Sequence, residues 1–353
     1  MMIDTKIIRI PPDAELSLID EALMPAAEII RSGGLVAFPT ETVYGLGADA
    51  TSELASKKIY AAKGRPSDNP LIIHLSTPED AEGYTYTNEV YYKLARAFMP
   101  GPITVVLPSR ETVPETTRGG LATVAVRCPS SRIANRLIKL SGVPIAAPSA
   151  NLSGSPSPTT AEHVMDDMMG RIDCIVDGGA SEVGLESTIV SVKSDNSVVL
   201  LRPGKITVDD IRALGIEVEI ARAVTESLRE GEIALSPGMK YRHYAPGAEV
   251  VLLDGSPDKA ISYIRARSYS NYAVICYSED VAQFESALGD ATIIDFGKRD
   301  DMLSQARSLF DILRAADKQS YDIIFAPLPP TEDIGLALYN RMIRAAAHKI
   351  IRL

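Results

Sequence analysis

Short apolar runs recur along the whole chain, separated by stretches in which apolar residues follow helical spacing. Such runs, when bounded by glycine, proline or polar residues, are typical of buried strands. A helix with proline at its first position is predicted from Pro25 to Ser32, ahead of the first run. Further along, helices are predicted between only some of the runs, so a mixed sheet is expected. The strands predicted for this α/β domain, which ends near Pro203-Gly204, cover residues 35–38, 71–75, 103–107, 123–127, 144–147, 174–176, 187–192 and 197–201.

A more regular alternation begins after Tyr244. The apolar runs VVLLDG, YAVICY, ATIIDFG and YDIIFAPLPP are separated by helical patterns, and the last is followed by GLALYNRMIRAAAHKI. This pattern predicts a smaller, Rossmann-like doubly wound parallel sheet. We therefore expect a first α/β domain at residues 1–205, a linker at 206–247 and a C-terminal Rossmann-like domain at 248–353.

Composition excludes several classes of protein. The 353 residues are 46% hydrophobic and 23% charged, as in an ordinary folded protein. A net charge of −10 argues against a wide face that binds duplex nucleic acid. Cys128, Cys174 and Cys276 form no CxxC pair, so neither a disulfide framework nor a zinc site is expected. The N-terminus has no signal-peptide pattern and no apolar run approaches the ~20 residues of a membrane span, so we expect a cytoplasmic protein.

The segment KGRPSDNPLIIH places two cations at the end of a predicted helix. Thr51 or Ser52 is expected to cap the start of this helix, and Gly64 to adopt the left-handed conformation at its end. Lys63 and Arg65 lie two apart, and an extended backbone would point both side chains to one side. Two cations at one place suit the chemistry of a triphosphate. Simple compensation of the helix dipole is the alternative.

Three loops rich in hydroxyl groups adjoin predicted strands. PTETVYGLGA follows the first strand and contains hydroxyls and glycines that suit a small polar ligand, although a glycine-rich turn is the alternative. It matches neither the Walker loop nor GxGxxG. APSANLSG places Ser149 and Asn151 just after a strand, where open α/β sheets bind ligands. Its alternative is a plain loop leading into a helix that Thr159 and Glu162 would cap. GLESTIV adds Ser187 before another strand, and a turn is again the alternative.

The four histidines show no metal-binding spacing. Because there is no HExxH motif and no partner cluster, metal catalysis through histidine ligands is not expected, and no metal ligand is assigned. His163 and His348 lie in helical patterns and are interpreted as structural. His74 at the end of a strand and His243 in the basic linker are better candidates for ligand contacts.

Taken in order, FPTETVYGLGADA, KGRPSDNPLIIH, MPGPITVVL, VAVRCP, APSANLSG, ESTIV and LRPG closely resemble the YrdC-like family. The segment SPGMKYRHYAP and the second α/β domain are similar to the longer, two-domain form of that family. The resemblance covers nearly the whole chain. It implies a YrdC-like twisted mixed sheet with flanking helices, followed by the smaller Rossmann-like domain.

The resemblance also implies a reaction. L-threonine, bicarbonate or CO2, and ATP would give threonylcarbamoyl-AMP and pyrophosphate, which makes the enzyme a nucleotidyltransferase. The adenylate would serve the threonylcarbamoyladenosine modification of tRNA next to the anticodon, completed by a separate downstream transferase. Mg²⁺ is expected with ATP. Contact with tRNA would be indirect or weak, and no membrane partner is implied.

Roles for individual residues are carried over from the same resemblance. Lys63 and Arg65 would be catalytic, and Tyr241 and His243 would let the linker close over the nucleotide. Arg127 would bind the carboxylate of threonine. The acceptor for the proton of the threonine amine is not identified. The residues implied to bind ATP are Lys63, Arg65, Asn69, Thr123, Ser149, Asn151, Ser157, Arg202, Tyr241 and His243. Those implied to bind L-threonine are Thr42, His74, Arg127, Ala147 and Ser187.

Two other functions share the YrdC-like pattern. A carbamoyl-transfer module of the hydrogenase-maturation type would be accompanied by acylphosphatase and zinc-finger segments, which this sequence does not contain. A YrdC-like module that binds structured RNA without ATP turnover would need a basic concave face, and the acidic net charge weakens that hypothesis.

Overall fold

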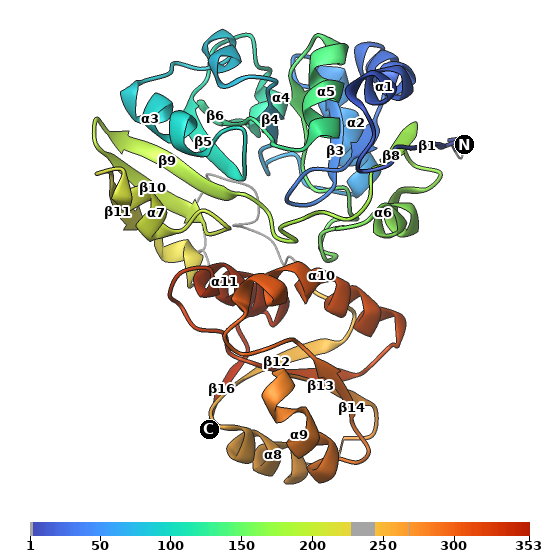
Figure 1. The fold of residues 1–353 in the computed structure, drawn as a ribbon, viewed down its shortest axis with the longest axis vertical. Coiled ribbons are helices and arrows are strands. Elements are labelled where there is room, and N and C mark those ends of the chain that lie inside the picture. The colour runs from blue at the N-terminus through green and yellow to red at the C-terminus, as the bar shows by residue number, and fades with distance from the viewer. Residues whose placement is uncertain (1–2, 227–243, 268) are drawn as a thin grey trace. The chain divides into compact units, whose positions relative to one another are not determined.

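The computed structural model describes residues 3–226, 244–267 and 269–353. The chain forms two compact units (Figure 1): strands β1 to β11 belong to the N-terminal unit, and strands β12 to β16 to the C-terminal unit. Among the described residues, no helix is both long enough and apolar enough to cross a membrane.

A twisted mixed sheet forms the centre of the N-terminal unit. Its strand order within the described residues is β1-β8-β2-β3-β7-β4-β6-β5-β9-β10-β11. The sheet contains both parallel pairs, such as β4 with β6, and antiparallel pairs, such as β5 with β6, which confirms the predicted mixed sheet. The strands are β1 (Lys6–Arg9), β2 (Val36–Phe38), β3 (Gly45–Asp49), β4 (Ile72–His74), β5 (Ile103–Pro108), β6 (Thr123–Arg127), β7 (Ile145–Ala146), β8 (Cys174–Asp177), β9 (Thr188–Ser194), β10 (Ser197–Arg202) and β11 (Glu217–Ile220).

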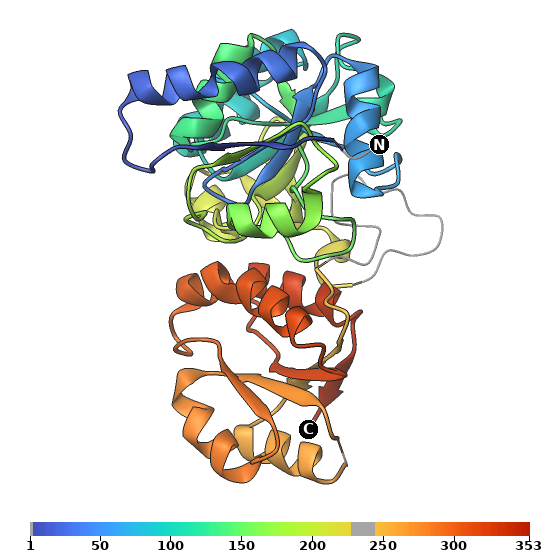
Figure 2. The same cartoon turned by 90° about the vertical axis from the view of Figure 1, so that its right-hand side faces the viewer.

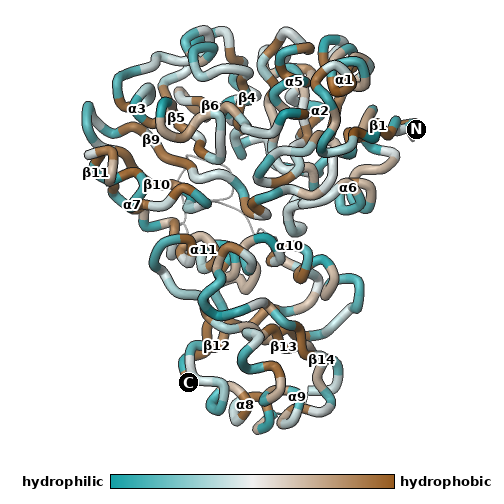
Figure 3. Tube along the Cα trace, in the orientation of Figure 1, coloured by the Kyte–Doolittle hydropathy of each residue, from teal (hydrophilic) through white to brown (hydrophobic). Residues whose placement is uncertain are grey.

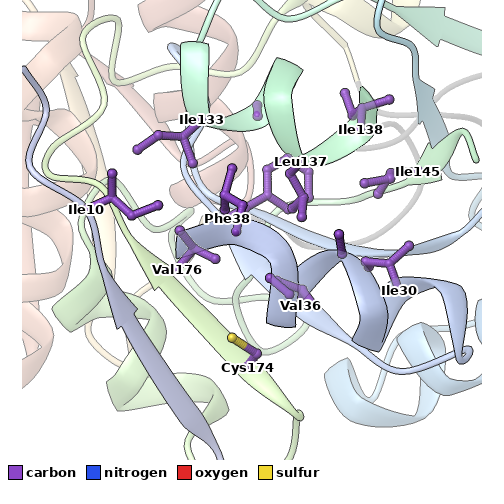
Figure 4. Packing of buried hydrophobic residues seen from close by; sticks show 14 of the residues in the cluster. Ile10, Ile30, Val36, Phe38, Ile133, Leu137, Ile138, Ile145, Cys174 and Val176 are labelled. Carbon is purple, nitrogen blue, oxygen red and sulfur yellow. The ribbon is translucent and has the colours of Figure 1, made fainter. Parts of the chain in front are cut away.

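Helices flank this sheet, and α1 and α5 pack side by side (Figure 1). Their apolar faces bury a cluster against β2, β7 and β8 that includes Phe38, Leu137 and Val176 (Figure 4). This cluster holds β2 in place, and the loop that contains Glu41 follows β2 directly. The helices are α1 (Leu16–Arg31), α2 (Glu53–Lys63), α3 (Glu89–Phe98), α4 (Glu115–Arg118), α5 (Arg132–Ser141), α6 (Ala161–Met168) and α7 (Val208–Ala213), with 3-10 turns η1 (Pro78–Gly83) and η2 (Arg222–Val224).

Two predictions about helix ends were wrong. Helix α1 begins at Leu16 rather than at Pro25, so Pro25 lies inside the helix. The helix persists through the proline because Ile19, Leu23 and Ile30 form one continuous buried stripe, whose burial outweighs the lost hydrogen bond. Helix α6 is capped by Thr160, whose hydroxyl accepts from the His163 amide, and not by a box of Thr159 and Glu162.

Part of PTETVYGLGA is a strand that the sequence interpretation missed. Residues 45–49 form β3, which pairs antiparallel with β2 and with β7. Glycine disfavours strands in general, which is why the pattern indicated a loop. A Cβ at Gly47 would lie 2.6 Å from Phe38 Cε1 and 2.7 Å from Ile145 Cγ2, so only glycine fits.

The beginning of the predicted linker belongs to the N-terminal unit. Helix α7 starts with a capping box between Thr207 and Asp210, and β11 pairs in parallel with β10. Residues 206–224, the beginning of the predicted linker, are therefore folded and belong to the N-terminal unit. Tyr241 and His243 lie outside the described residues.

The C-terminal unit contains a parallel sheet with the strand order β14-β13-β15-β12-β16. Helices α8 and α9 lie on one face, and α10 and α11 on the other (Figures 1 and 2), which confirms the doubly wound prediction. Its inner strands β12 and β13 are hydrophobic (Figure 3). The elements are β12 (Glu249–Asp254), α8 (Pro257–Arg265), β13 (Tyr272–Cys276), η3 (Ser278–Asp280), α9 (Val281–Ala287), β14 (Thr292–Asp295), α10 (Met302–Lys318), β15 (Ile323–Pro327), α11 (Gly335–Ala345) and β16 (Ile350–Arg352).

Strand β16 was not predicted, because GLALYNRMIRAAAHKI was interpreted as helical to its end. Helix α11 stops at Ala345, and His348 lies beyond it with φ 62°. The prediction that His348 sits in a helix was therefore wrong.

Candidate active site

The two cations of KGRPSDNPLIIH lie on either side of a helix end. Helix α2 is capped by the Ser52 hydroxyl, and it stops where Gly64 turns left-handed with φ 61°, as predicted. Lys63 is the last helical residue, so the backbone from Lys63 to Arg65 is not extended and the argument from strand-like alternation was wrong. The Lys63 side chain is nevertheless buried, and its Nζ donates to the carbonyl oxygens of Ser149 and Asn151. The helix end is thereby joined to the loop APSANLSG.

Arg65 is bonded to its own loop. Its guanidinium donates to the carbonyl oxygens of Asn69 (3.3 Å) and Pro70 (3.1 Å), just before β4. The Asn69 side chain is buried, and its Oδ1 has no hydrogen-bond partner among the residues that the structure describes. A buried amide oxygen without a partner is uncommon in a folded protein and suits contact with a ligand.

The loop APSANLSG follows β7 and is held in a single arrangement. An isolated bridge pairs Ser149 with Gly45 of β3, and the amide of Ser153 donates to the Lys63 carbonyl at 2.9 Å. The Ser149 hydroxyl donates to Asn151 Oδ1, whose Nδ2 donates to the Leu152 carbonyl. The structure therefore brings Ser149 and Asn151 together with Lys63, although they are 86 and 88 residues apart in sequence.

A buried ion pair lies at the ends of neighbouring strands. Arg127, the last residue of β6, donates from an Nη atom to Glu41 Oε1 at 2.6 Å, and each side chain is 5% exposed. His74 ends β4 and is the register partner of Arg127 across the parallel pair, so both side chains leave the sheet on one face. Glu41 comes from the loop between β2 and β3. Three elements thus meet at this point.

Burial, together with the positive charge of Arg127, lowers the pKa of His74 from its ordinary 6.5 to about 3. The imidazole is therefore neutral at physiological pH. A neutral imidazole next to an arginine can donate or accept a hydrogen bond without repelling that cation.

This pKa shift predicts how stability depends on pH. Between pH 6.5 and pH 3 the unfolded chain binds a proton at His74 and the folded chain does not, so stability falls as the pH falls. The free energy of unfolding should fall between pH 7 and pH 4 in both proteins. We expect this fall to be about 2–3 kcal/mol smaller in His74→Gln than in the unsubstituted protein. Urea unfolding at the two pH values measures the difference. Equal losses in the two proteins would contradict the assignment.

A second polar group forms around Ser187, just before β9. The Ser187 hydroxyl lies 2.7 Å from the Thr104 hydroxyl, and Arg202 donates to it at 3.1 Å. Arg202 also donates to the Ser187 carbonyl at 3.0 Å. Ser187 was implied to bind threonine and Arg202 to bind the nucleotide, and the structure places the two in direct contact.

Gly204 makes this arrangement possible. A Cβ at Gly204 would lie 2.6 Å from the amide nitrogen of Thr188 and 2.8 Å from the carbonyl oxygen of Glu186. The end of LRPG can therefore lie against ESTIV only with glycine at this position.

The remaining predicted residues lie in different surroundings. Thr42 is buried, and its hydroxyl is 2.8 Å from that of Thr40. The Ser157 hydroxyl donates to buried Glu186 at 2.5 Å. The amide of Ala147 donates to the Ile72 carbonyl, so that donor is used within the fold. Thr123 begins β6, at the other end of the strand from Arg127 and about 13 Å away along it.

Glu41, Thr104 and Glu186 belong to these clusters but were not assigned a role from the sequence. Glu41 and Glu186 lie within motifs that were recognised, each directly before a residue that was chosen. A buried carboxylate is uncommon in proteins. Burial, however, is a property of the fold and is not visible in the motif.

Comparisons with known proteins agree with this architecture. A family model described as Sua5_yciO_yrdC, telomere recombination, matches residues 28–204. A second, described as threonylcarbamoyl-AMP synthase, C-terminal domain, matches residues 206–347. The N-terminal unit is thus of the Sua5/YciO/YrdC class.

Relatives match the chain across both units. Threonylcarbamoyl-AMP synthase of Pyrococcus abyssi is 44% identical over 93% of this chain and 94% of its own length. Threonylcarbamoyl-AMP synthase of Bacillus subtilis is 43% identical over 96% of each chain. The crystal structure of P. abyssi Sua5 complexed with L-threonine has a TM-score of 0.88 and 42% identity, covering 99% of this chain and 100% of that one. The chain therefore belongs to the threonylcarbamoyl-AMP synthase family.

Proposed function

We propose that this chain is an L-threonylcarbamoyladenylate synthase, a nucleotidyltransferase that converts L-threonine, bicarbonate or CO2, and ATP into threonylcarbamoyl-AMP and pyrophosphate. The observation that carries the proposal is a group of buried polar side chains in the N-terminal unit: the ion pair of Glu41 and Arg127, and neutral His74 beside it. Burying such groups costs free energy unless they are fully hydrogen-bonded, and a polar ligand can supply the missing hydrogen bonds. The names of the relatives and the threonine in the P. abyssi structure support the choice of ligand.

The proposed reaction has two bond-forming steps. The threonine ammonium gives up two of its three protons as its nitrogen forms a C–N bond to CO2, which yields a carbamate that keeps one N–H. A carbamate oxygen then forms a bond to the α-phosphorus of ATP, the bond from that phosphorus to the bridging oxygen breaks, and pyrophosphate leaves with the electron pair. Lys63 and Arg65 stabilise the negative charge that develops on the phosphates. No covalent enzyme intermediate is required.

Nucleotide binding is assigned to the residues that the family resemblance implies for it, among them Asn69, Ser149, Asn151 and Arg202. Mg²⁺ enters this scheme with ATP as part of the substrate. In the described parts of the chain, no group of three or more His, Cys, Asp or Glu side chains is arranged to hold a metal ion. The phosphates and water would therefore supply most of the ligands of Mg²⁺.

The product implies a partner reaction. A mixed anhydride of a carbamate and AMP is reactive, so a second enzyme has to consume it. We assign this step to a downstream transferase that modifies adenosine in tRNA, and contact of this chain with tRNA need only be indirect. We place the reaction in the cytoplasm. Support comes from Cys128, Cys174 and Cys276, which are free thiols, as in a reducing compartment.

Pyrophosphate release tests the proposal directly. We expect release from ATP to require both L-threonine and bicarbonate, and threonylcarbamoyl-AMP to appear in equal amount by mass spectrometry. Omitting either substrate is the matched control. Release that does not respond to threonine, or salt-dependent tRNA binding without any ATP turnover, would contradict the enzyme assignment.

A further inference from the structure

Glu41 and Arg127 form a buried ion pair that is only half satisfied. One Nη atom of Arg127 donates to one oxygen of Glu41 at 2.6 Å, and each side chain is 5% exposed. The second oxygen, Glu41 Oε2, is buried without a hydrogen-bond partner among residues 3–226, 244–267 and 269–353. Within the same described ranges, Arg127 Nε and His74 Nδ1 also have none.

An ion pair in this condition is costly for the fold. Two charges removed from water need several good hydrogen bonds to compensate for lost hydration. A buried polar atom left unsatisfied costs about 1–3 kcal/mol, and more when the group is charged. Here the three such atoms belong to His74 at the end of β4, Arg127 at the end of β6, and Glu41 in the loop after β2. Buried atoms left unsatisfied in this way call for an explanation, and a bound polar ligand supplies one.

The free atoms have the polarity that an amino-acid zwitterion requires. A free carboxylate oxygen on Glu41 accepts hydrogen bonds, and the free Nε–H of Arg127 donates one. In a zwitterion the ammonium and the carboxylate are held on one carbon, and here an anion and a cation are held 2.6 Å apart. A zwitterion can therefore lie alongside the ion pair, with its ammonium facing Glu41 and its carboxylate facing Arg127.

We propose that Glu41 binds the ammonium group of the amino-acid substrate through Oε2, while Arg127 binds its carboxylate. The inference rests on the proposed function, because it assigns the substrate of that reaction to one pair of side chains. Glu41 is then a binding and specificity residue, and the site discriminates a zwitterion from a simple hydroxy acid. His74, being neutral, adds a hydrogen bond without changing the charge balance.

Calorimetric binding of two ligands to the full chain tests this assignment. The ligands are L-threonine and 2,3-dihydroxybutanoate, which carries a hydroxyl in place of the ammonium. We expect Glu41→Gln to weaken L-threonine binding by ~10- to 100-fold, the range for loss of one charged hydrogen bond. Binding of 2,3-dihydroxybutanoate should change by less than about threefold, because that ligand makes no ion pair with Glu41. Glu28→Gln is the matched control, since Glu28 pairs with Arg31 on the surface of the same unit, and it should change neither affinity.

Three outcomes would overturn the inference. Unchanged threonine binding in Glu41→Gln would do so, as would equal weakening of both ligands, which would mark the pair as structural only. If Glu41→Gln does not fold, the unsubstituted protein still decides, because equal affinity for the two ligands would rule out ammonium recognition. These results are distinguishable from failure of the proposed function, in which the unsubstituted protein releases no pyrophosphate in response to threonine.

Discussion

Lys63→Ala is expected to reduce threonine-dependent pyrophosphate release by on the order of 100- to 1,000-fold, the range seen when one preorganised donor to a developing negative charge is removed. Lys63 is buried, and its ammonium is held by the carbonyl oxygens of Ser149 and Asn151. Those bonds fix its position before any ligand binds, and a positioned charge in a buried site contributes most to the transition state. Since threonine is assigned to Glu41 and Arg127, its affinity should change by less than about threefold. Steady-state rates and calorimetry measure the two quantities.

The Lys63→Ala substitution also removes the two hydrogen bonds from Lys63 to the loop that follows β7, so a lower rate could come from a displaced loop. Lys58→Ala is the matched control. Lys58 lies on the same helix and likewise donates to a backbone carbonyl, that of Gly33, but it is exposed. It should retain the full rate. A Lys63→Ala protein that keeps its rate within about threefold would show that this lysine only anchors the loop.

Elements whose local pattern and tertiary role agree could be predicted from the sequence. The C-terminal strands β12, β13 and β15 are nearly continuous apolar runs, because both faces of a parallel sheet are covered. Helix α2 carries its own start and stop in Ser52 and Gly64, so its end was predicted to the residue. Failures arose where packing overrides the local signal. Helix α1 continues through Pro25, and β3 forms in a glycine-rich segment because glycine alone fits beside Phe38.

In the candidate site, too, local sequence indicated some features and only the fold determined others. The motifs pointed to loops rich in hydroxyl, amide and cationic residues, and the structure brings Lys63 of one such segment into contact with Ser149 and Asn151 of another. The pairing of Glu41 with Arg127 could not be predicted, because the two are 86 residues apart and their contact depends on the strand order of the sheet. Position in a motif does not distinguish an exposed carboxylate from a buried one.

Arg127→Met is expected to lower the free energy of unfolding of the N-terminal unit by about 3–5 kcal/mol, because it leaves the Glu41 carboxylate buried without its counterion. Methionine fills much of the volume of arginine, so the loss reports the charge rather than a cavity. L-threonine binding should be lost as well, since the proposed carboxylate partner is gone. Urea unfolding and calorimetry measure the two effects. Arg31→Met is the matched control: Arg31 pairs with Glu28 in solvent, and its loss should have little effect on either.

The double variant Glu41→Gln/Arg127→Met separates the fold from the site. Once the carboxylate is replaced by a neutral amide, no buried charge is left unpaired, so most of the stability lost in Arg127→Met should return. Threonine binding should not return, because both charged partners of the zwitterion are missing. A pair kept for stability would give the opposite pattern, with the double variant no more stable than Arg127→Met. Recovery of the fold without recovery of binding would show that the ion pair is kept for the ligand, at a cost to the stability of the empty protein.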